Sequence, residues 1–231
     1  VLFTMSNEYD MAVIEIGTNQ PGEIAILSEV AAPTHGLITN ISEEHLEFLI
    51  DLVGVELEET YLFGYLRKKN GMVLLNQDDE VLNRYGQLIE KKETYGQTDG
   101  ASYKGDIILN ENLNPTIELE YFGNQFTANL STIGYSSALN AIAAAAVGLH
   151  FDISGEETRD ALESYRQDDS KDFGRMRLEE TESLKIINDS YNADLEGLAA
   201  ALAPLRQLDA YRLRTVVLSD ILQSGLPTES L

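Results

Sequence analysis

The chain has 231 residues, enough for one large domain or two smaller ones, and 43% of them are hydrophobic, so a substantial core is available. It carries 16 basic and 39 acidic side chains, a formal net charge of −23. This balance argues against nucleic acids and anionic membranes as partners, because binding to them depends on Lys and Arg neutralising phosphates. The chain contains no cysteine, which excludes disulfides, thiolate catalysis and cysteine metal sites.

The sequence also lacks the signals of export or membrane insertion. No apolar run reaches the roughly 20 residues needed to cross a bilayer. The first residues have neither the basic start nor the apolar stretch of a signal peptide. We therefore expect no membrane insertion and a cytoplasmic location. Because the chain opens on Val1, we also expect that it begins partway through a longer protein.

The first third of the chain alternates between strand and helix patterns. Residues 11–16 form a nearly continuous apolar run, which predicts a strand buried on both faces. A helix is predicted after Gly22, with apolar residues three to four apart as far as Val30. A second buried strand is predicted over 36–39, followed by Ser42 as a helix N-cap.

Helix 52–67 and strand 71–76 continue this alternation, which is typical of an α/β fold with a mostly parallel sheet. The pattern then changes. Two segments with a period of two, 116–121 and 125–130, flank a Phe-Gly-Asn turn and predict a β-hairpin.

The last third is predicted to contain a domain boundary. Helices are expected over 138–149 and 156–165, and the polar stretch 166–172 is typical of a linker. After the linker the α/β pattern restarts, with strand 184–188, helix 195–207 and strand 215–219. We predict two units, 1–172 and 173–231, of which the second is too short to be a complete domain.

Two ionisable side chains, one Glu and one His, lie at or after the carboxyl ends of the first two predicted strands. Glu15 lies near the carboxyl end of strand 11–16, where ligands gather in open parallel sheets, and a carboxylate there could hold Mg²⁺. A strand-end Glu that simply faces water is the alternative. His45 follows strand 36–39 at the same edge, but the chain has only three His, so a His-rich metal site is excluded. A lone His is also commonly structural or solvent-facing.

The segments around these residues carry a family resemblance. "IEIGTNQPGEI" followed by "PTHGLITNISEEHLE" resembles the central ATPase domain of the Mur ligases, and most closely the branch that adds D-alanyl-D-alanine. The resemblance continues in order through "TIGYSSALNAIAAAAVGLHFDIS", "FGRMRLEE", "IINDSYNADLEGLAAAL" and "TVVLSDILQSG". It implies a central domain with a hairpin insertion, followed by the start of a Rossmann-like C-terminal domain. It further suggests the ligase half of a ligase–alanine racemase fusion.

The resemblance implies site residues by position. Glu15 and His45 match the family's Mg²⁺-binding pair, Asn140 matches an adenine-contacting Asn, and Arg175 matches the hinge arginine that approaches nucleotide phosphates. Three further residues match the C-terminal motif that faces the nucleotide when the domains close: Asp189, Tyr191 and Asn192. The implied cofactors are ATP and Mg²⁺. The implied partners are a UDP-linked muramoyl peptide and D-alanyl-D-alanine, joined through an acyl phosphate.

The sequence departs from the family at several positions. It has no G-x-x-x-x-G-K-[ST] loop, whose backbone N–H groups and Lys cradle a triphosphate. The family's carbamylated lysine is expected within Leu57-Glu58-Glu59, with Glu59 as the best match, and Glu59 would keep a negative charge on a shorter stem. Ser137, Asp194 and Glu44 replace an Asn, a Pro and a small residue of the family pattern.

Three hypotheses follow. The chain is a fragment, inactive when isolated, of a working ligase that adds D-alanyl-D-alanine. Alternatively, it belongs to a degenerate relative kept as a binding or assembly module, as the missing loop and Glu59 indicate. A third possibility is a Mur-type ligase that acts on a different amino acid or on folate, although the G-T-N-Q-P-G-E segment argues against it.

Overall fold

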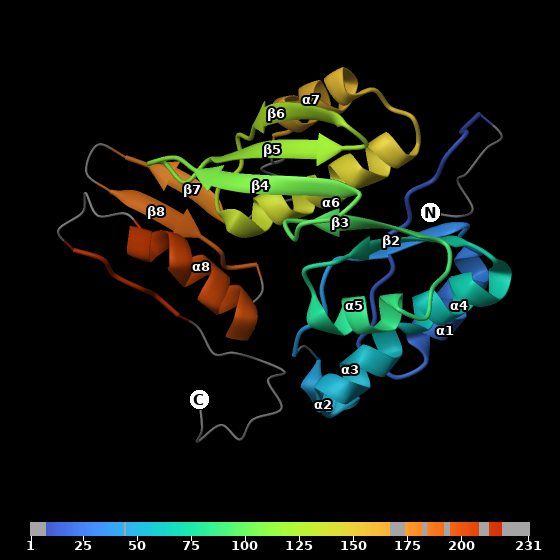
Figure 1. Cartoon of the computed structure of the whole chain (residues 1–231). Helices are drawn as coiled ribbons and strands as arrows, with labels where there is room; N and C mark the ends of the chain where they lie inside the picture. The colour runs from blue at the N-terminus through green and yellow to red at the C-terminus, as the bar shows by residue number, and fades with distance from the viewer. Residues whose placement is uncertain are drawn as a thin grey trace.

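The computed structural model of the chain describes residues 8–43, 45–166, 174–181, 184–191, 195–207 and 213–218. Its main feature is a six-stranded sheet in the order β1-β2-β3-β4-β5-β6 (Figure 1). The strands are β1 (His35–Ile38), β2 (Met72–Asn76), β3 (Lys92–Gly96), β4 (Tyr103–Leu109), β5 (Pro115–Tyr121) and β6 (Asn124–Asn129).

Strands β1 to β4 run parallel to one another, and β4, β5 and β6 form an antiparallel meander. The predicted α/β fold with a mostly parallel sheet is confirmed. So is the predicted hairpin, in which Tyr121 of β5 pairs with Asn124 of β6 around a tight turn. Gly123 takes φ 81° in this turn, a left-handed conformation that favours glycine.

Helices cover both faces of the sheet. Those described are α1 (Glu23–Ala31), α2 (Leu46–Leu49), α3 (Leu52–Glu59), α4 (Tyr61–Lys69), α5 (Glu80–Gly86), α6 (Tyr135–His150), α7 (Gly155–Ser164) and α8 (Leu195–Gln207). On one face, Val73 and Leu75 of β2 pack with Phe63 and Leu66 of α4 and with Leu82 of α5.

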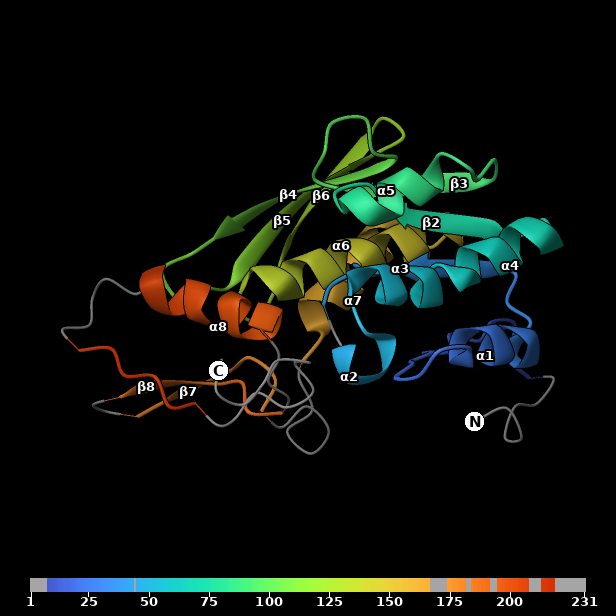
Figure 2. The ribbon, with the colours of Figure 1, turned by 90° about the horizontal axis from the view of Figure 1, so that it is seen from below.

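The opposite face of the sheet is covered by α6. Leu74 of β2 packs there with residues of β3 to β6 and with the small face of α6, including Ala138 and Ile142. Figure 2 shows α6 lying along the sheet with α7 beside it, where α7 contacts β6. Because successive strand residues point to opposite faces, β2 is buried from both sides and forms the centre of the core.

Several predicted elements differ from the structure. The strand predicted over 11–16 does not form. These residues are extended, pair with no described strand and are largely exposed, with Val13 at 85%. β1 is an edge strand of the sheet, and segment 11–16 does not pair with its open side, so this segment lacks the ladder hydrogen bonds of a strand. The strand predicted over 215–219 is likewise absent from 213–218, and Ser219 lies outside the described residues.

Two helix boundaries also differ. The helix predicted over 52–67 divides into α3 and α4 at Thr60, whose hydroxyl donates to the Glu56 carbonyl and competes with the helical ladder. Ser42 is not an N-cap, because α2 begins at Leu46 with His45 as its N-cap. The Ile41 N–H donates instead to Asp79 Oδ2, which holds this segment outside a helix. Helix α5 and strands β3 and β4 were not predicted.

The C-terminal part contains a two-stranded antiparallel sheet, β7 (Arg177–Glu180) and β8 (Lys185–Asn188), and helix α8, which matches the prediction over 195–207. Figure 1 shows these elements together at the left of the molecule. Met176 and Ile187 pack against Leu113 and Ile133 of the first part of the chain. The predicted boundary between 1–172 and 173–231 falls at 167–173, outside the described residues, and stays a prediction.

No helix in the described part of the chain is long and apolar enough to span a membrane.

Two of the three His lie together at the start of β1 and the end of α6. The rings of His35 and His150 are 5.1 Å apart, and each also contacts the Phe151 ring. His150 Nδ1 lies 2.9 Å from Glu93 Oε2, which also accepts the Tyr103 hydroxyl at 2.5 Å. Burial and the charge of His150 lower the pKa of His35 below its usual 6.5.

This cluster predicts a pH-dependent stability. Because the folded state binds the His35 proton less readily than the unfolded state, stability is lost as pH falls through 6.5 and stops falling below the lowered pKa. Burial opposes ionisation of Glu93, but hydrogen bonds from Tyr103 and His150 still lower its pKa below the usual 4.5. Protonation of Glu93 therefore affects stability only below pH 4.5, outside the range of the proposed melts. Thermal melts between pH 7.5 and 5 should show a falling midpoint in the wild-type chain and a flatter profile in His35→Gln. Parallel profiles would contradict this assignment.

The fit between α6 and β4 gives a second prediction. A Cβ added at Gly105 of β4 would meet Ile142 Cδ1 at 2.5 Å, and Ile142 is only 1% exposed, so it has little room to move. Gly105→Ala should therefore lower the free energy of unfolding by about 1–3 kcal/mol. Gly64→Ala is the matched control, because nothing lies within 4 Å of a Cβ there in helix α4. That variant should stabilise the chain by up to about 1 kcal/mol, as urea titration would measure.

Candidate functional site

The carboxyl ends of β1, β2 and β3 meet at one edge of the sheet, because these strands are parallel. The chain segments that leave them are joined by hydrogen bonds. Asn76 Nδ2 donates to the Thr39 carbonyl at 2.7 Å, and Asp79 Oδ2 accepts the Ile41 N–H at 2.8 Å. The buried Tyr95 hydroxyl donates to the Ile38 carbonyl at 3.3 Å. This edge is where ligands bind in open α/β sheets.

The segment after strand β2 links this edge to β3. Asp78 accepts hydrogen bonds from the Gln97 and Thr98 N–H groups and from the Thr98 hydroxyl, all within 2.9 Å. Burial, together with the charges of Asp79 and Asp78, raises the pKa of Tyr95, so its hydroxyl stays a donor. We did not predict Asn76, Asp78, Asp79 or Tyr95 as site residues. The run Asn-Gln-Asp-Asp, which begins at the last residue of the predicted strand 71–76, was the signal that could have identified three of them.

Residues 18–24, which we call the loop Thr18–Ile24, lead into α1 and include its first two residues. This loop is folded around two carboxylates. The first is Glu23, whose Oε2 accepts the Asn19 N–H at 2.9 Å, the Gln20 N–H at 3.1 Å and the Thr18 hydroxyl at 3.1 Å. The Asn19 N–H lowers the pKa of Glu23 most, and burial opposes it. Gln20, Thr18 and the charge of His45 lower it further. Glu23 therefore ionises readily.

The second carboxylate comes from α3. Glu58 is only 8% exposed, and it accepts the Gly22 N–H at 2.6 Å and the Ile24 N–H at 2.8 Å. These groups lie at the N-terminus of α1, where Gly22 takes the left-handed φ of 91°. Glu58 thus occupies the place where an anion would bind to this helix end.

The residues predicted for Mg²⁺ lie next to this loop. Glu15 is exposed in the unpaired segment that precedes it. His45 is half-buried at the start of α2, and its charge acts on Glu23. Glu59 is half-buried at the last position of α3, beside Glu58. No structural observation tests the roles predicted for these three residues.

The residues predicted to face the nucleotide from the C-terminal part form a second group. The Arg175 guanidinium carbon lies 3.9 Å from the centre of the Tyr191 ring, a cation–π contact. Asp189 Oδ1 accepts the Met176 N–H at 3.0 Å, and the Tyr191 N–H donates to the Gly174 carbonyl. The structure therefore brings Arg175, Asp189 and Tyr191 together.

Of the other two predicted nucleotide residues, the structure describes only Asn140. Asn140 is exposed on α6. Asn192, and also Asp194 and Glu44, lie outside the described residues.

The residues present fit a Mg²⁺ ion that is shared with a nucleotide, not one held by protein alone. No group of three or more His, Asp and Glu suited to a metal ion occurs among the described residues. Mg²⁺ commonly takes only one or two carboxylates and completes its shell with phosphate oxygens and water. Glu23 and Glu58 are already hydrogen-bonded to backbone N–H groups. Glu15 is thus the exposed carboxylate of this segment that remains for such an ion.

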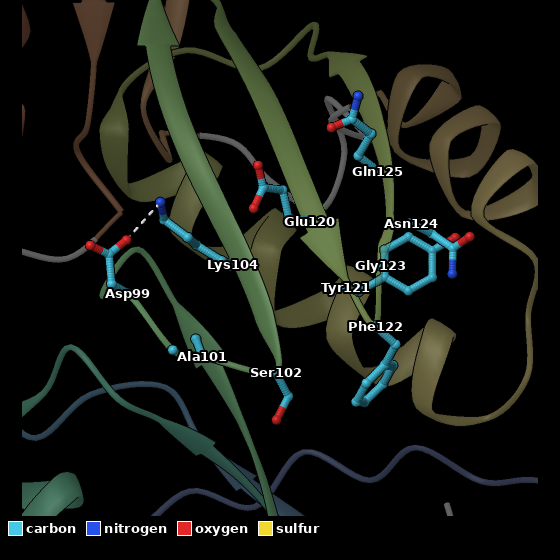
Figure 3. Close-up of a pocket in the computed structure, with 11 residues that line it drawn as sticks. Asp99, Ala101, Ser102, Lys104, Glu120, Tyr121, Phe122, Gly123, Asn124 and Gln125 are labelled. Carbon is cyan, nitrogen blue, oxygen red and sulfur yellow. Dashed lines mark ion pairs between the residues drawn. The ribbon is translucent and has the colours of Figure 1, made fainter.

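A cavity of about 470 Å³ lies between the β3–β4 connection and the β5–β6 turn (Figure 3). Figure 3 shows Lys104 and Asp99 pointing toward each other, with 2.9 Å between Nζ and Oδ1. The hydrogen bond with Asp99 and the nearby Asp106 raise the pKa of Lys104. Because its ammonium is already paired, the lysine offers little attraction to an anionic ligand, and we assign no function to this cavity.

Comparisons with known sequences agree with the fold. The chain is 27% identical over 225 residues to the UDP-N-acetylmuramoyl-tripeptide–D-alanyl-D-alanine ligase of Bacillus subtilis (strain 168), covering 97% of the chain and 47% of that protein. It is 28% identical over 239 residues to the enzyme of that name from Escherichia coli (strain K12), covering 99% and 50%. The chain thus spans about half the length of the curated relatives it matches.

Solved structures give the same result for the fold. MurF from Acinetobacter baumannii superposes with a TM-score of 0.79 at 23% identity, covering 89% of this chain and 44% of that one. MurF from Thermotoga maritima, solved in complex with ADP, gives 0.72 at 22% identity, covering 83% and 43%. Residues 1–148, well over half of the sequence, match the Mur ligase middle domain, and the chain therefore belongs to the Mur ligase family.

Proposed function

We propose that the chain is part of an ATP-dependent ligase that adds D-alanyl-D-alanine to UDP-N-acetylmuramoyl-tripeptide. The observation that carries the proposal is the loop Thr18–Ile24, which is held by Glu23 and Glu58, follows Glu15 in the chain and lies within reach of the charge of His45. The relatives that carry this activity in their names match nearly the whole chain, which supports the choice of substrates.

The proposed reaction has two steps. The terminal carboxylate of the muramoyl tripeptide attacks the γ-phosphorus of ATP, which releases ADP and leaves an acyl phosphate. The amine of D-alanyl-D-alanine then attacks the acyl carbon, inorganic phosphate leaves, and an amide bond forms as the amine gives up a proton. Mg²⁺, when bound, would neutralise charge on the phosphate oxygens.

The chain's own residues have separate proposed roles. Glu15 and His45 would bind the metal ion, Asn140 would contact the adenine, and Glu59 would stand in for a carbamylated lysine. Arg175 would approach the nucleotide phosphates from the C-terminal part. Its stacking on Tyr191 and the hydrogen bond of Asp189 to the Met176 N–H support this, because they hold the arginine on an ordered turn.

These 231 residues contain no G-x-x-x-x-G-K-[ST] sequence, so the usual backbone cradle for a triphosphate is not among them. The N-terminus of α1 does not replace it, because Glu58 already accepts its N–H groups. We propose that the chain supplies one side of the nucleotide site and that catalysis needs further segments of a longer protein. The isolated chain should be inactive as a ligase.

One observation favours a second candidate, a Mur-ligase-like binding module without catalysis. The loop Thr18–Ile24 closes on the chain's own carboxylates, Glu23 and Glu58, and so needs no ligand to satisfy its N–H groups. Glu59 at the position of the carbamylated lysine points the same way. Such a module would bind no ATP in a Mg²⁺-dependent manner.

Calorimetric titration of the chain with ATP, with and without excess Mg²⁺, tests the proposed nucleotide site. We expect weak, Mg²⁺-dependent binding with a dissociation constant on the order of 1 mM. This corresponds to a binding free energy of about 4 kcal/mol, which is small because only one side of the site is present. Glu15→Gln should weaken the Mg²⁺-dependent part about tenfold. Glu118→Gln, an exposed change on β5, is the control and should have no effect. Binding that ignores Mg²⁺, or no binding, would favour the module.

Ligation by a longer protein that contains this chain tests the activity itself. We expect phosphate release from ATP only when both D-alanyl-D-alanine and the UDP-linked tripeptide are present. Arg175→Ala should lower kcat/KM by about 10²-fold or more, because a positioned cation stabilises the charge that develops during phosphoryl transfer. Turnover with another amino acid in place of the dipeptide would instead assign a different Mur-type substrate.

A further inference from the structure

The buried carboxylate of Glu58 lies next to the proposed metal site but has no role in the proposed reaction. We infer that Glu58 is a positioning residue: it fixes the loop Thr18–Ile24 against α3 and so sets where Glu15 and His45 stand for a Mg²⁺–nucleotide. This inference rests on the proposed function, since it is the nucleotide site that the loop would shape.

The hydrogen-bond geometry makes both oxygens of Glu58 necessary. Oε2 accepts the Gly22 N–H at 2.6 Å, and Oε1 accepts the Ile24 N–H at 2.8 Å. The Thr18 hydroxyl also lies within 3.4 Å of Oε1. A Gln at this position would turn one of the two oxygens into an NH₂ group, which would then face a backbone N–H, donor against donor.

Burial makes these bonds matter energetically. Glu58 is 8% exposed, and a charged carboxylate with so little contact with water requires compensating donors. Here the donors are backbone N–H groups at the N-terminus of α1, and the helix dipole adds a favourable field. Because the Glu58 charge and the loop stabilise each other, removing the charge should release the loop from α3.

Two observations relate the loop to the predicted metal ligands. Thr18 Oγ1 lies between Glu58 and Glu23, at 3.4 Å and 3.1 Å, and Glu23 is the carboxylate that senses the charge of His45. Glu15 precedes Thr18 by only three residues. Gly22 takes a left-handed φ of 91°, and its N–H is held by the Glu58 carboxylate. Glu58 is therefore the contact through which α3 orders this segment.

The adjacent Glu59 does not serve this purpose. Successive helix positions point about 100° apart, so two neighbouring side chains on α3 face different surroundings. Glu58 is the side chain that reaches Gly22 and Ile24, whereas Glu59 occupies the position of the family's lysine. The two glutamates of α3 thus have different tasks: Glu58 orders the loop, and Glu59 keeps a charge at the lysine position.

Glu58→Gln tests the inference with three measurements on the whole chain: amide hydrogen exchange at Gly22 and Ile24, ATP affinity with and without Mg²⁺, and the melting temperature. We expect exchange at both amides to rise about tenfold or more and Mg²⁺-dependent ATP affinity to fall about tenfold. Asp51→Ala is the control, because it removes the N-cap of α3, whose carboxylate accepts the Gly54 N–H at 2.9 Å. It should lower the melting temperature without either of the other changes.

Unchanged exchange in Glu58→Gln would overturn the inference, and so would faster exchange with unchanged Mg²⁺-dependent affinity. If Glu58→Gln does not fold, Glu58→Asp keeps the charge but shortens the side chain, so the carboxylate no longer reaches both the Gly22 and Ile24 N–H groups, and the same two outcomes decide. Absence of ATP binding by the wild-type chain is a different result: it would overturn the proposed function and the positioning role with it. The exchange data would then still report whether Glu58 holds the loop.

Discussion

Val73 and Leu75 pack toward α4 and α5, and Leu74 between them packs toward α6, so the central strand β2 is buried on both faces. A shift of one residue in its register would exchange the two sets of side chains and expose or misplace all three. Because β1 and β3 are hydrogen-bonded to β2 in parallel register, their carboxyl ends are held at the same edge. The candidate site depends on this alignment, since the segments of Thr39, Asp78 and Asp79 all start there.

The chain has far more acidic than basic side chains, yet the carboxylates that order these loops are stabilised mainly by backbone N–H groups. Glu23, Glu58, Asp78 and Asp79 each accept at least one such bond. This arrangement orders the loops without cations. For the proposed phosphoryl transfer, cations would have to come from other segments, and Arg175 is our candidate in the C-terminal part.

Membership of the Mur ligase family and the likeness to MurF structures account for the sheet, the hairpin and the position of the loops. They do not account for the pair Glu58-Glu59 on α3. Glu58 accepts hydrogen bonds from the N-terminus of α1, and Glu59 is the residue that we propose for the position of the family's lysine. A pair of carboxylates near a nucleotide repels phosphate unless metal or N–H donors neutralise it. The Gly22 and Ile24 N–H groups do this for Glu58.

By itself, the sequence determined the α/β class, the β5–β6 hairpin, helices α6, α7 and α8, and the identity of Glu15 and His45 as candidates, because these follow from local periodicity and contiguous motifs. It predicted 11–16 as a strand from its apolar content, but whether a strand forms depends on a partner that supplies hydrogen bonds. It also pointed to Glu59 by counting along the chain, whereas only the tertiary structure decided that Glu58 contacts the loop. That contact joins residues 34 to 36 positions apart, and only the packing of α3 beside α1 brings them within hydrogen-bonding distance.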